Sequence, residues 1–395
     1  MKTIRTGDQN LVKQLNKSIV FNFIEHKGPV SRAQISKDTG LNKATVSTMA
    51  SELINDSFIY EIGEGQSSGG RKPVMLYFNN HAGYSIGIDL GVNYILGVLS
   101  DLRGNIIEEE TRSLNDSKLD NVIGHLTAVI ESLVKKAPVS PYGVIGIGIG
   151  VPGNVDKDDK ILFAPNLNWK QVDLKQIIEN RFHIPTKIDN EANAGAHGER
   201  LYGAGKNIAN LIYVSIGIGI GTGIIINNNL YTGSSGISGE LGHVTIEASG
   251  RKCPCGNRGC WELYASEKAL LTAAEEQHLL EKDHAEGLDC LIKEAQMGNP
   301  GVLQQLNRLG EYIGIGLVNI VNTFNPEVVV IGNRIARFKH WIINPITHIL
   351  EERLSPYHKS NTEIRFSELG KHSIAIGAAS FSISKFLEDK RVSVQ

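Results

Sequence analysis

The stretch from 238 to 262, SGELGHVTIEASGRKCPCGNRGCWE, constrains the structure more than any other part of the chain. Three of the four cysteines fall in it with the spacing CxCxxxxC, and a histidine precedes them. Thiolate and imidazole groups at this spacing are typical of a closed tetrahedral zinc site. We therefore predict a structural Zn²⁺ ion bound by His243, Cys253, Cys255 and Cys260. The alternative is a loop of buried thiols that binds no metal.

The same stretch places two carboxylates beside the expected metal. Glu240 precedes the histidine, and Glu262 follows the last cysteine. A bound metal would hold both side chains on one side of a pocket, and fixed acceptors of this kind suit polyhydroxylated ligands.

Length and composition bound the class of protein. The chain of 395 residues is long enough to fill two or three hydrophobic cores. It has no apolar run of membrane-spanning length, and its first residues, MKTIRTGDQN, lack the apolar centre of a secretory signal. The few cysteines are clustered, as in proteins of a reducing compartment. These features predict a cytoplasmic protein with no membrane partner.

The charge is small overall but uneven. A net charge of −2 argues against indiscriminate binding to nucleic acid. Residues 1–80 carry ten Lys or Arg against seven Asp or Glu, whereas the rest of the chain carries thirty against thirty-five. The positive excess is therefore at the N-terminus, where a local basic face could meet phosphates.

The first part of the chain has the pattern of a winged helix-turn-helix. Gly28-Pro29 ends a first helix, expected between Leu11 and Glu25, whose apolar residues recur at helical spacing: Leu11, Leu15, Ile19, Val20 and Phe23. Ser31 and Gln34 have the pattern of a capping box that opens a second helix.

A third helix is expected to begin at Asn42, after a turn at Gly40. Val46, Ala50 and Leu53 form its buried stripe. Strands are expected at 58–61 and 74–78, on either side of a Gly- and Ser-rich wing. Two short helices joined by a glycine turn and followed by this hairpin predict a winged helix.

Polar and basic residues of this domain are the candidates for DNA contact. Short polar groups on the third helix suit base edges in a major groove, and the basic pair at the end of the wing suits the backbone or a narrow minor groove. The candidates are Ser31, Arg32, Asn42, Lys43, Thr45, Ser47, Thr48, Arg71 and Lys72. The alternative is a winged helix that packs against a protein.

Beyond residue 80 the chain repeats a strand, a glycine turn and a second strand, in YSIGIDLGVNYILGVLSD and in LIYVSIGIGIGTGIIINNN. Two such halves facing each other across a cleft are typical of the actin-like, sugar-kinase-like (ribonuclease H-like) fold, in which glycine turns cradle phosphates. Alternatively, these glycines only permit close packing of strands.

The predicted class is therefore α/β, with three domains. They are a winged helix-turn-helix at 1–80, a first lobe at 81–188, and a second lobe at 189–395 that holds the zinc site. The C-terminal helix of the second lobe is expected to return to the first lobe.

Over nearly its whole length the chain resembles the ROK family of bacterial repressors and sugar kinases, and its xylose repressors most of all. The resemblance rests on the winged helix and on the motifs DLG, GVPG, NLNW, DNEAN, GELGH, CPCGNRGCWE and FNPEVVVIG. It implies a sugar site lined by Asn166, Asn190, Glu191, Glu240, His243 and Glu262. His243 would then serve both the sugar and the zinc.

The motifs expected of the family's kinases are altered in this chain. Val92-Asn93 replaces Gly-Thr after the DLG turn, Gly217-Ile218-Gly219 replaces Gly-Thr-Gly in the second phosphate loop, and Gly332-Asn333 replaces a double glycine. Glu191 replaces the general-base aspartate. Branched side chains at phosphate turns block approach of the backbone, and a base displaced by about a methylene can cost on the order of a hundredfold in rate. We expect no catalytic residue and no kinase activity.

The resulting hypothesis is a homodimeric, sugar-responsive transcriptional repressor. It would hold a palindromic operator of xylose-utilisation genes and release it when xylose binds. The alternatives are a ROK sugar kinase that carries a DNA-binding domain, and a repressor that responds to glucose, N-acetylglucosamine or a partner protein.

Overall fold

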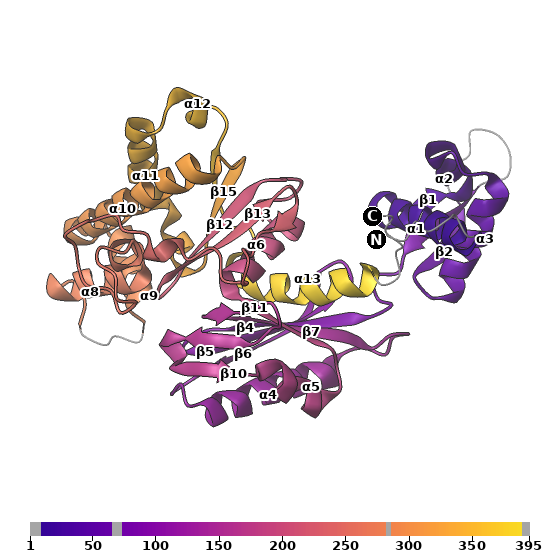
Figure 1. The fold of residues 1–395 in the computed structure, drawn as a ribbon, viewed down its shortest axis with the longest axis horizontal. Helices are drawn as coiled ribbons and strands as arrows, with labels where there is room; N and C mark the ends of the chain where they lie inside the picture. The colour runs from indigo at the N-terminus through magenta and orange to yellow at the C-terminus, as the bar shows by residue number, and fades with distance from the viewer. Residues whose placement is uncertain (1–8, 65–72, 282–285, 389–395) are drawn as a thin grey trace.

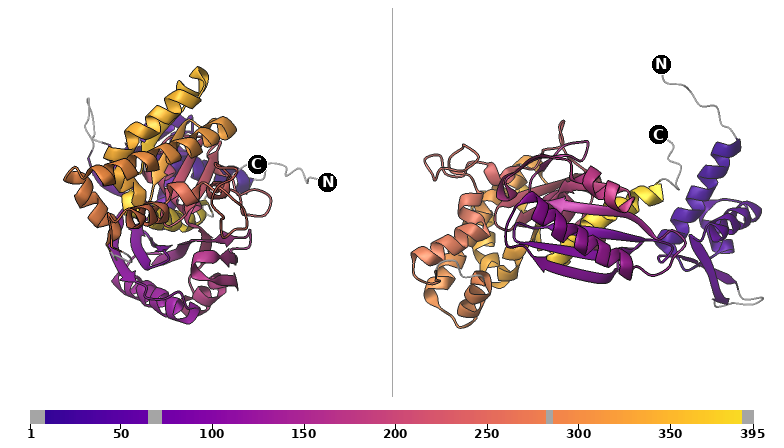
Figure 2. Two further views of the ribbon diagram at one scale, coloured as in Figure 1. Left: turned by 90° about the vertical axis from the view of Figure 1, so that its left-hand side faces the viewer. Right: turned by 90° about the horizontal axis from the view of Figure 1, so that it is seen from below.

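A computed structural model of the chain describes residues 9–64, 73–281 and 286–388 (Figure 1). A small N-terminal domain is followed by two lobes, each built on a five-stranded sheet with helices, which confirms the predicted α/β class. The N-terminal domain lies at one end of the molecule, opposite the helical layer of the second lobe (Figure 2). No helix in the described ranges is both long and apolar enough to cross a membrane.

The N-terminal domain is three helices and a small antiparallel sheet in the order β1-β3-β2. Its elements are α1 (Gln9–Lys27), β1 (Val30–Ser31), α2 (Arg32–Thr39), α3 (Lys43–Asn55), β2 (Ile59–Glu64) and β3 (Val74–Phe78). The stripe expected on α3 is buried, with Val46 and Ala50 at 0% exposure and Leu53 at 3%. This is the expected winged helix, with the tip of the wing outside the described residues.

Two details of α1 and α2 differ from the sequence expectation. Ile19, one of the apolar residues at helical spacing in α1, is 42% exposed, whereas Phe21, outside that set, is buried. The Phe21 ring centre lies 5.6 Å from that of Phe58 and 5.9 Å from that of Phe78. At α2, the Ser31 hydroxyl accepts a hydrogen bond from the Gln34 backbone N–H, but the Gln34 side chain donates to Asp38 instead of reaching back. Only half of the predicted capping box therefore forms.

The first lobe has the sheet order β11-β7-β4-β5-β6, with β4, β5 and β6 antiparallel and β7 and β11 parallel to β4. The strands are β4 (Tyr84–Leu90), β5 (Tyr94–Asp101), β6 (Ile106–Ser113), β7 (Val144–Val151) and β11 (Thr186–Asn190). Apolar side chains of α4 (Leu119–Lys136) and α5 (Leu174–Phe182) cover one face of this sheet. A small second sheet is formed by β8 (Asn154–Val155), β9 (Ile161–Ala164) and β10 (Trp169–Val172).

The second lobe repeats this plan in the order β14-β13-β12-β15-β16. The strands are β12 (Leu211–Ile216), β13 (Ile220–Ile226), β14 (Asn229–Leu230), β15 (Val328–Gly332) and β16 (Glu363–Phe366). A larger helical layer covers one face of the sheet and encloses the biggest core of the molecule. Its helices are α7 (Glu262–Ala265), α8 (Glu267–Glu276), α9 (Gly287–Gln296), α10 (Pro300–Phe324), α11 (Lys339–Arg353) and α12 (Pro356–Lys359).

Two helices pack between the sheets and hold the lobes together. α6 (Glu191–Tyr202) covers the second sheet, and α13 (Ser373–Glu388) lies on β4 and β7 of the first (Figure 1). A Cβ atom at Gly148 of β7 would lie 1.8 Å from the carbonyl oxygen of Ala378, and one at Gly377 would lie 1.7 Å from that of Ala194. Glycine is therefore needed at both positions, because a side chain there would prevent the backbones from approaching.

The far end of α13 enters the core of the winged helix. Ile383 and Leu387 are buried in the same apolar cluster as the residues of α1 and α3. The Phe386 ring lies 5.1 Å from the Tyr142 ring and 5.8 Å from the Phe58 ring. The Tyr142 hydroxyl also donates to the backbone carbonyl of Asp56, at 2.8 Å. One helix thus joins all three parts of the chain.

Replacing Leu387 by Ala tests this attachment. Leu387 is 4% exposed, and truncating a buried leucine costs about 2–5 kcal/mol. We expect faster amide hydrogen exchange in α1 and β2, with exchange in β12 and β13 unchanged. The exposed Met297→Ala is the control and should leave all four segments unchanged. Unaltered exchange in α1 and β2 of the Leu387 variant would contradict the attachment.

Candidate functional site

The predicted metal ligands lie together in the segment that leads from η2 to α7 in the second lobe. His243 ends the short 3₁₀ helix η2 (Leu241–His243), and the three cysteines precede α7. One ligand atom from each of His243, Cys253, Cys255 and Cys260 lies within 4.8 Å of all the others. Cys253 and Cys260 are buried, whereas Cys255 is exposed. We call residues 243–261 the knot.

The knot is held by its backbone and by one tryptophan. Gly259 has a φ of 69°, and a Cβ there would lie 1.8 Å from the carbonyl oxygen of Glu247, so glycine is required at this turn. Trp261 is 1% exposed, and its indole N–H donates to the Tyr312 carbonyl of α10 at 2.8 Å. The knot is thereby fixed to the longest helix of the second lobe.

The distances within the cluster suit a tetrahedral ion. The sulfur atoms of Cys255 and Cys260 are 3.7 Å apart, and the Cys253 sulfur lies 3.7 Å from His243 Nδ1. A tetrahedral site with metal–sulfur bonds of about 2.3 Å has edges of about 3.7 Å. Two of the six distances between ligand atoms therefore match a tetrahedral site, and all four ligand atoms lie within 4.8 Å of one another.

Two carboxylates connect this cluster to the cleft. Glu262 Oε1 lies 3.3 Å from His243 Nδ1 and accepts a hydrogen bond from the Cys253 thiol at 3.4 Å. On the other side of the imidazole, Glu240 Oε2 lies 3.9 Å from His243 Nε2. Burial raises the pKa of Glu240, and the nearby Glu262 raises it further while His243 lowers it. The three side chains form one row of polar groups.

The cleft between the lobes contains a pocket whose free space, counted out to the solvent, is about 390 Å³. Turns of both lobes line it, including the one at Gly91 and the one at Gly217 and Gly219. Among the predicted sugar residues, Asn166 and Glu191 line this pocket. Glu262 reaches its edge, because its Oε2 would lie 2.9 Å from a Cβ at Gly219.

Asn190 is placed differently from the other predicted sugar residues. It caps α6, with its side-chain oxygen accepting from the Ala192 N–H at 2.8 Å, and its amide nitrogen donates to the Gly153 carbonyl at 3.0 Å. The amide therefore already fixes the helix that begins with Glu191. Its role toward a sugar stays a prediction, as do the roles of the other five.

A buried acidic group behind Tyr94, which lines the pocket, was not predicted. Asp89, at the end of β4, is 1% exposed, and its Oδ2 accepts a hydrogen bond from the Tyr94 hydroxyl at 2.7 Å. Burial raises the pKa of Asp89 to about 7, although the Tyr94 hydrogen bond lowers it. Burial also raises the pKa of Glu191 to about 8, helped by the charge of Asp89. The tyrosine three residues after the DLG turn was the available signal.

Side chains fill the part of the cleft beside the second phosphate loop. Asn333 has a φ of 64°, a conformation that favours glycine, and its amide donates to the Ser215 hydroxyl at 2.9 Å. A Cβ at Gly217 would lie 3.0 Å from this amide. Arg334 forms an ion pair with Glu267 at 2.9 Å. The Tyr94 ring similarly lies against Gly91 of the first loop.

The predicted DNA-binding residues divide into helix caps and exposed groups. Ser31 and Asn42 cap α2 and α3, each accepting a backbone N–H three residues later. Arg32 pairs with Glu61 of β2. Among the α3 candidates, Thr45 is half-buried and the others are exposed: Lys43, Ser47 and Thr48. Arg71 and Lys72 lie outside the described residues.

Comparison with known proteins shows which family the chain is similar to. The ROK family model matches residues 85–385. The xylose repressor of Bacillus subtilis is 48% identical over 382 residues, which cover 97% of this chain and 98% of that protein.

Solved structures give the same result. A ROK family transcriptional regulator, a homologue of the Escherichia coli MLC protein, superposes with a TM-score of 0.79 and 29% identity over 96% of this chain and 98% of that one. A ROK glucokinase from Streptomyces griseus, in complex with glucose and AMPPNP, superposes with a TM-score of 0.69 and 27% identity over 75% of this chain and 98% of that one. The predicted two-lobed fold is thus confirmed. Because the family model covers most of the chain and the similarity to the xylose repressor extends through the winged helix, the chain belongs to the ROK family.

Proposed function

We propose that the chain is a sugar-responsive transcriptional repressor, which holds operator DNA of xylose-utilisation genes through its winged helix and releases it when xylose binds in the cleft. The observation that carries this proposal is the 48% identity to a xylose repressor over 97% of the chain, winged helix and cleft included. The exposed polar face of α3 supports DNA as the partner, because such groups suit a major groove.

The pocket supports a sugar as the effector. Asn166 and Glu191 line it, and Glu262 reaches its edge beside His243 and Glu240. These groups are hydrogen-bond acceptors and one imidazole, which suits the donors and acceptors of a polyol. Two neighbouring groups with raised pKa, Asp89 and Glu191, are typical of a functional site.

The knot would bind one Zn²⁺ ion through His243, Cys253, Cys255 and Cys260. The ion would have a structural role and would hold the imidazole, and with it Glu262, against the second phosphate loop. The 3.7 Å edges and the sulfur-rich ligand set support zinc.

The same cleft is not expected to transfer phosphate. The Asn333 amide nitrogen lies 3.0 Å from the place of a Cβ at Gly217, and the Tyr94 ring lies against Gly91. The backbone N–H groups of Gly91 and Gly217 donate to the carbonyls of Tyr94 and Gly219, whereas phosphate binding needs free backbone N–H groups.

The position of α6 allows a conformational change at the sugar site to be transmitted to the DNA-binding domain. α6 begins with Glu191 in the pocket and packs along α13, whose far end lies in the core of the winged helix. A shift of α6 on sugar binding would move α13 and the DNA-reading helix with it. Two chains in a homodimer would present two such helices to a palindromic operator, since one winged helix reads one half-site.

Operator binding measured by fluorescence anisotropy at fixed salt tests the function. We expect a tight complex with a xylose-operon operator fragment that xylose dissociates and that glucose and N-acetylglucosamine leave intact. Salt is held constant because it alone shifts such affinities. Binding that no sugar alters would contradict sugar control, and release by another sugar would replace xylose as effector.

Two lysine variants distinguish a direct DNA contact by the winged helix from an effect of the overall charge of the protein, in the same assay. Lys43→Gln on α3 should weaken operator binding and reduce the slope of log affinity against log salt by about 1, as expected for one lost phosphate contact. Lys268→Gln on α8 removes an equally exposed charge far from the winged helix and should change neither quantity.

Replacing Cys255 by Ser tests the metal. Cys255 is exposed, so its loss should leave the hydrophobic core intact. We expect the wild-type chain to contain about one zinc per chain, and the variant to lose most of it and to bind xylose at least about tenfold more weakly. Cys290→Ser on α9 is the matched control and should keep the metal. Purified wild-type protein without metal but with intact xylose binding would contradict the site.

The raised pKa of Glu191 predicts a pH-dependent stability. The folded chain holds this proton up to a pKa of about 8, whereas the ordinary value is 4.5. Between these values the unfolded chain binds fewer protons, so the free energy of unfolding falls as the pH rises. Glu191→Gln should reduce this fall between about pH 5 and pH 8, measured by chemical denaturation. Glu276→Gln, an exposed control, should leave the fall unchanged; an equal fall in both variants would refute the prediction.

A further inference from the structure

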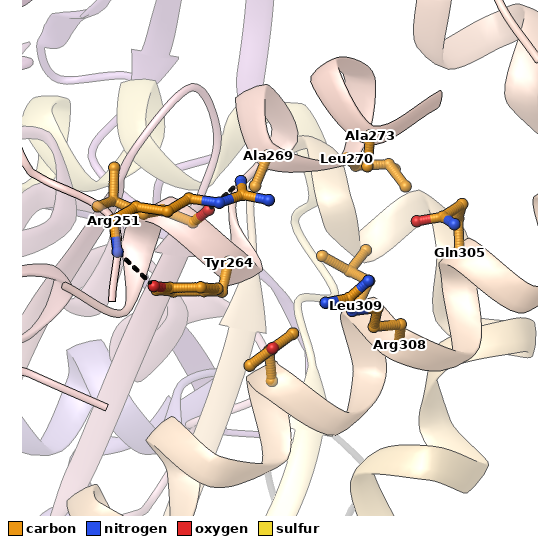
Figure 3. Close-up of a pocket in the computed structure, with 10 residues that line it drawn as sticks. Arg251, Tyr264, Ala269, Leu270, Ala273, Gln305, Arg308 and Leu309 are labelled. Carbon is orange, nitrogen blue, oxygen red and sulfur yellow. Dashed lines mark hydrogen bonds between the residues drawn. The ribbon is translucent and has the colours of Figure 1, made fainter. Parts of the chain in front are cut away.

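A second pocket lies outside the cleft, between the knot, α8 and α10. Its free space, counted out to the solvent, is about 380 Å³. Arg251 of the knot and Tyr264 of α7 form one side, and Gln305 and Arg308 of α10 form another (Figure 3). None of the residues that line it is an aspartate or a glutamate.

Both arginines are oriented by tyrosines. The Arg251 guanidinium lies 5.5 Å from the centre of the Tyr264 ring, and the Arg308 guanidinium lies 5.7 Å from that of Tyr312. The two rings are themselves in contact, with centres 5.0 Å apart. Stacking on a ring fixes a guanidinium plane and leaves N–H groups on its edge for other partners. One N–H of Arg251 donates to the Leu263 carbonyl at 3.4 Å, and its other N–H groups remain for a ligand. Within the described residues, neither arginine forms an ion pair with a carboxylate.

An amide side chain completes the pocket. Gln305 is 6% exposed and lines the pocket, and its side chain forms no hydrogen bond with another described residue. Its polar atoms are not among the fully buried atoms of the described residues that lack a partner, so they are accessible from the open space of the pocket. A ligand that displaces water there would accept or donate a hydrogen bond at this amide. The remaining wall is apolar and includes Leu263, Leu270 and Leu309.

We propose that this pocket is a binding site for a small organic oxyanion, distinct from the sugar site in the cleft. The two guanidinium edges would bind a phosphate or carboxylate group, and the Gln305 amide would bind a polar group of the same molecule. The apolar wall would contact its carbon skeleton.

The position of the pocket would allow such a ligand to affect the conformation of the knot. Arg251 is two residues before Cys253, and Tyr264 is two residues after Glu262. The Tyr264 hydroxyl accepts a hydrogen bond from the backbone N–H of Arg251 at 2.8 Å, so the middle of the knot is joined to α7 at the pocket. An oxyanion held there would stabilise the knot in one conformation.

Isothermal titration calorimetry on the full chain, at constant ionic strength, tests the site. Inorganic phosphate, glycerol 3-phosphate and malate are the probes, with glycerol as the neutral control. We expect saturable one-to-one binding of at least one oxyanion and none of glycerol. The phosphate and malate arms distinguish a phosphate ligand from a carboxylate ligand.

Variants assign the binding to this pocket. Arg308→Gln should weaken it by roughly tenfold, since it removes one charge-assisted contact. Gln305→Leu, of similar size, should also weaken it without lowering the melting temperature, because the amide has no partner to lose. Arg353→Gln on α11 is the matched control and should bind as the wild type does.

Absence of saturable binding for all three probes would overturn the proposal, and so would equal binding by the wild type and both pocket variants. Xylose affinity, measured on the same samples, keeps the two sites apart. Oxyanion binding that is lost in Arg308→Gln while xylose affinity persists would support a separate site.

Discussion

The contact of α13 with the first sheet, with α6 and with the winged helix is the interaction on which the rest of the structure depends. Glycines in β7 and in α13 itself let backbone meet backbone, since a Cβ at Gly148 or Gly377 would lie less than 2 Å from a facing carbonyl oxygen. Such a contact leaves no compressible layer of side chains, so movement of one partner is passed on to the other. In the last turns of the same helix, Ile383 and Leu387 contribute side chains to the hydrophobic core of the winged helix.

The chemistry of the cleft follows from which groups the fold brings together there. Glu191 opens α6 directly at the pocket, and the knot brings Glu262 to the opposite loop. Burial makes Asp89 and Glu191 resist ionisation, and the charge of Asp89 adds to this effect at Glu191, as their raised pKa values indicate. A polyol that donates hydrogen bonds to them would relieve part of that cost, whereas a nucleotide triphosphate would add to it. This contrast favours a sensor of sugar over a kinase in the same fold.

Local signals in the sequence predicted local structure well. The caps Ser31 and Asn42, the buried stripe of α3, the repeated strand–turn–strand units and the clustering of His243 with three cysteines all follow from spacing and residue type, and the structure contains each of them. Helical periodicity alone does not say which of two adjoining apolar faces meets the neighbouring aromatic rings, so it did not separate the exposed Ile19 from the buried Phe21. The position of Tyr94 after the DLG turn was visible in the sequence, but its hydrogen bond to Asp89 was not. The pocket beside Arg251 also could not be found in advance, because its walls are brought together only by tertiary packing. The insertion of α13 into the core of the winged helix could not be predicted either, because no sequence motif indicates it.

Sensing requires that sugar and operator compete through the shared helix, and linkage makes this competition reciprocal. The most direct test is a calorimetric titration of the full chain with xylose, performed once alone and once with a saturating operator fragment. If α13 couples the cleft to the winged helix, operator must lower the affinity for xylose by the same factor by which xylose lowers the affinity for operator. Equal xylose affinities in the two titrations would contradict the coupling.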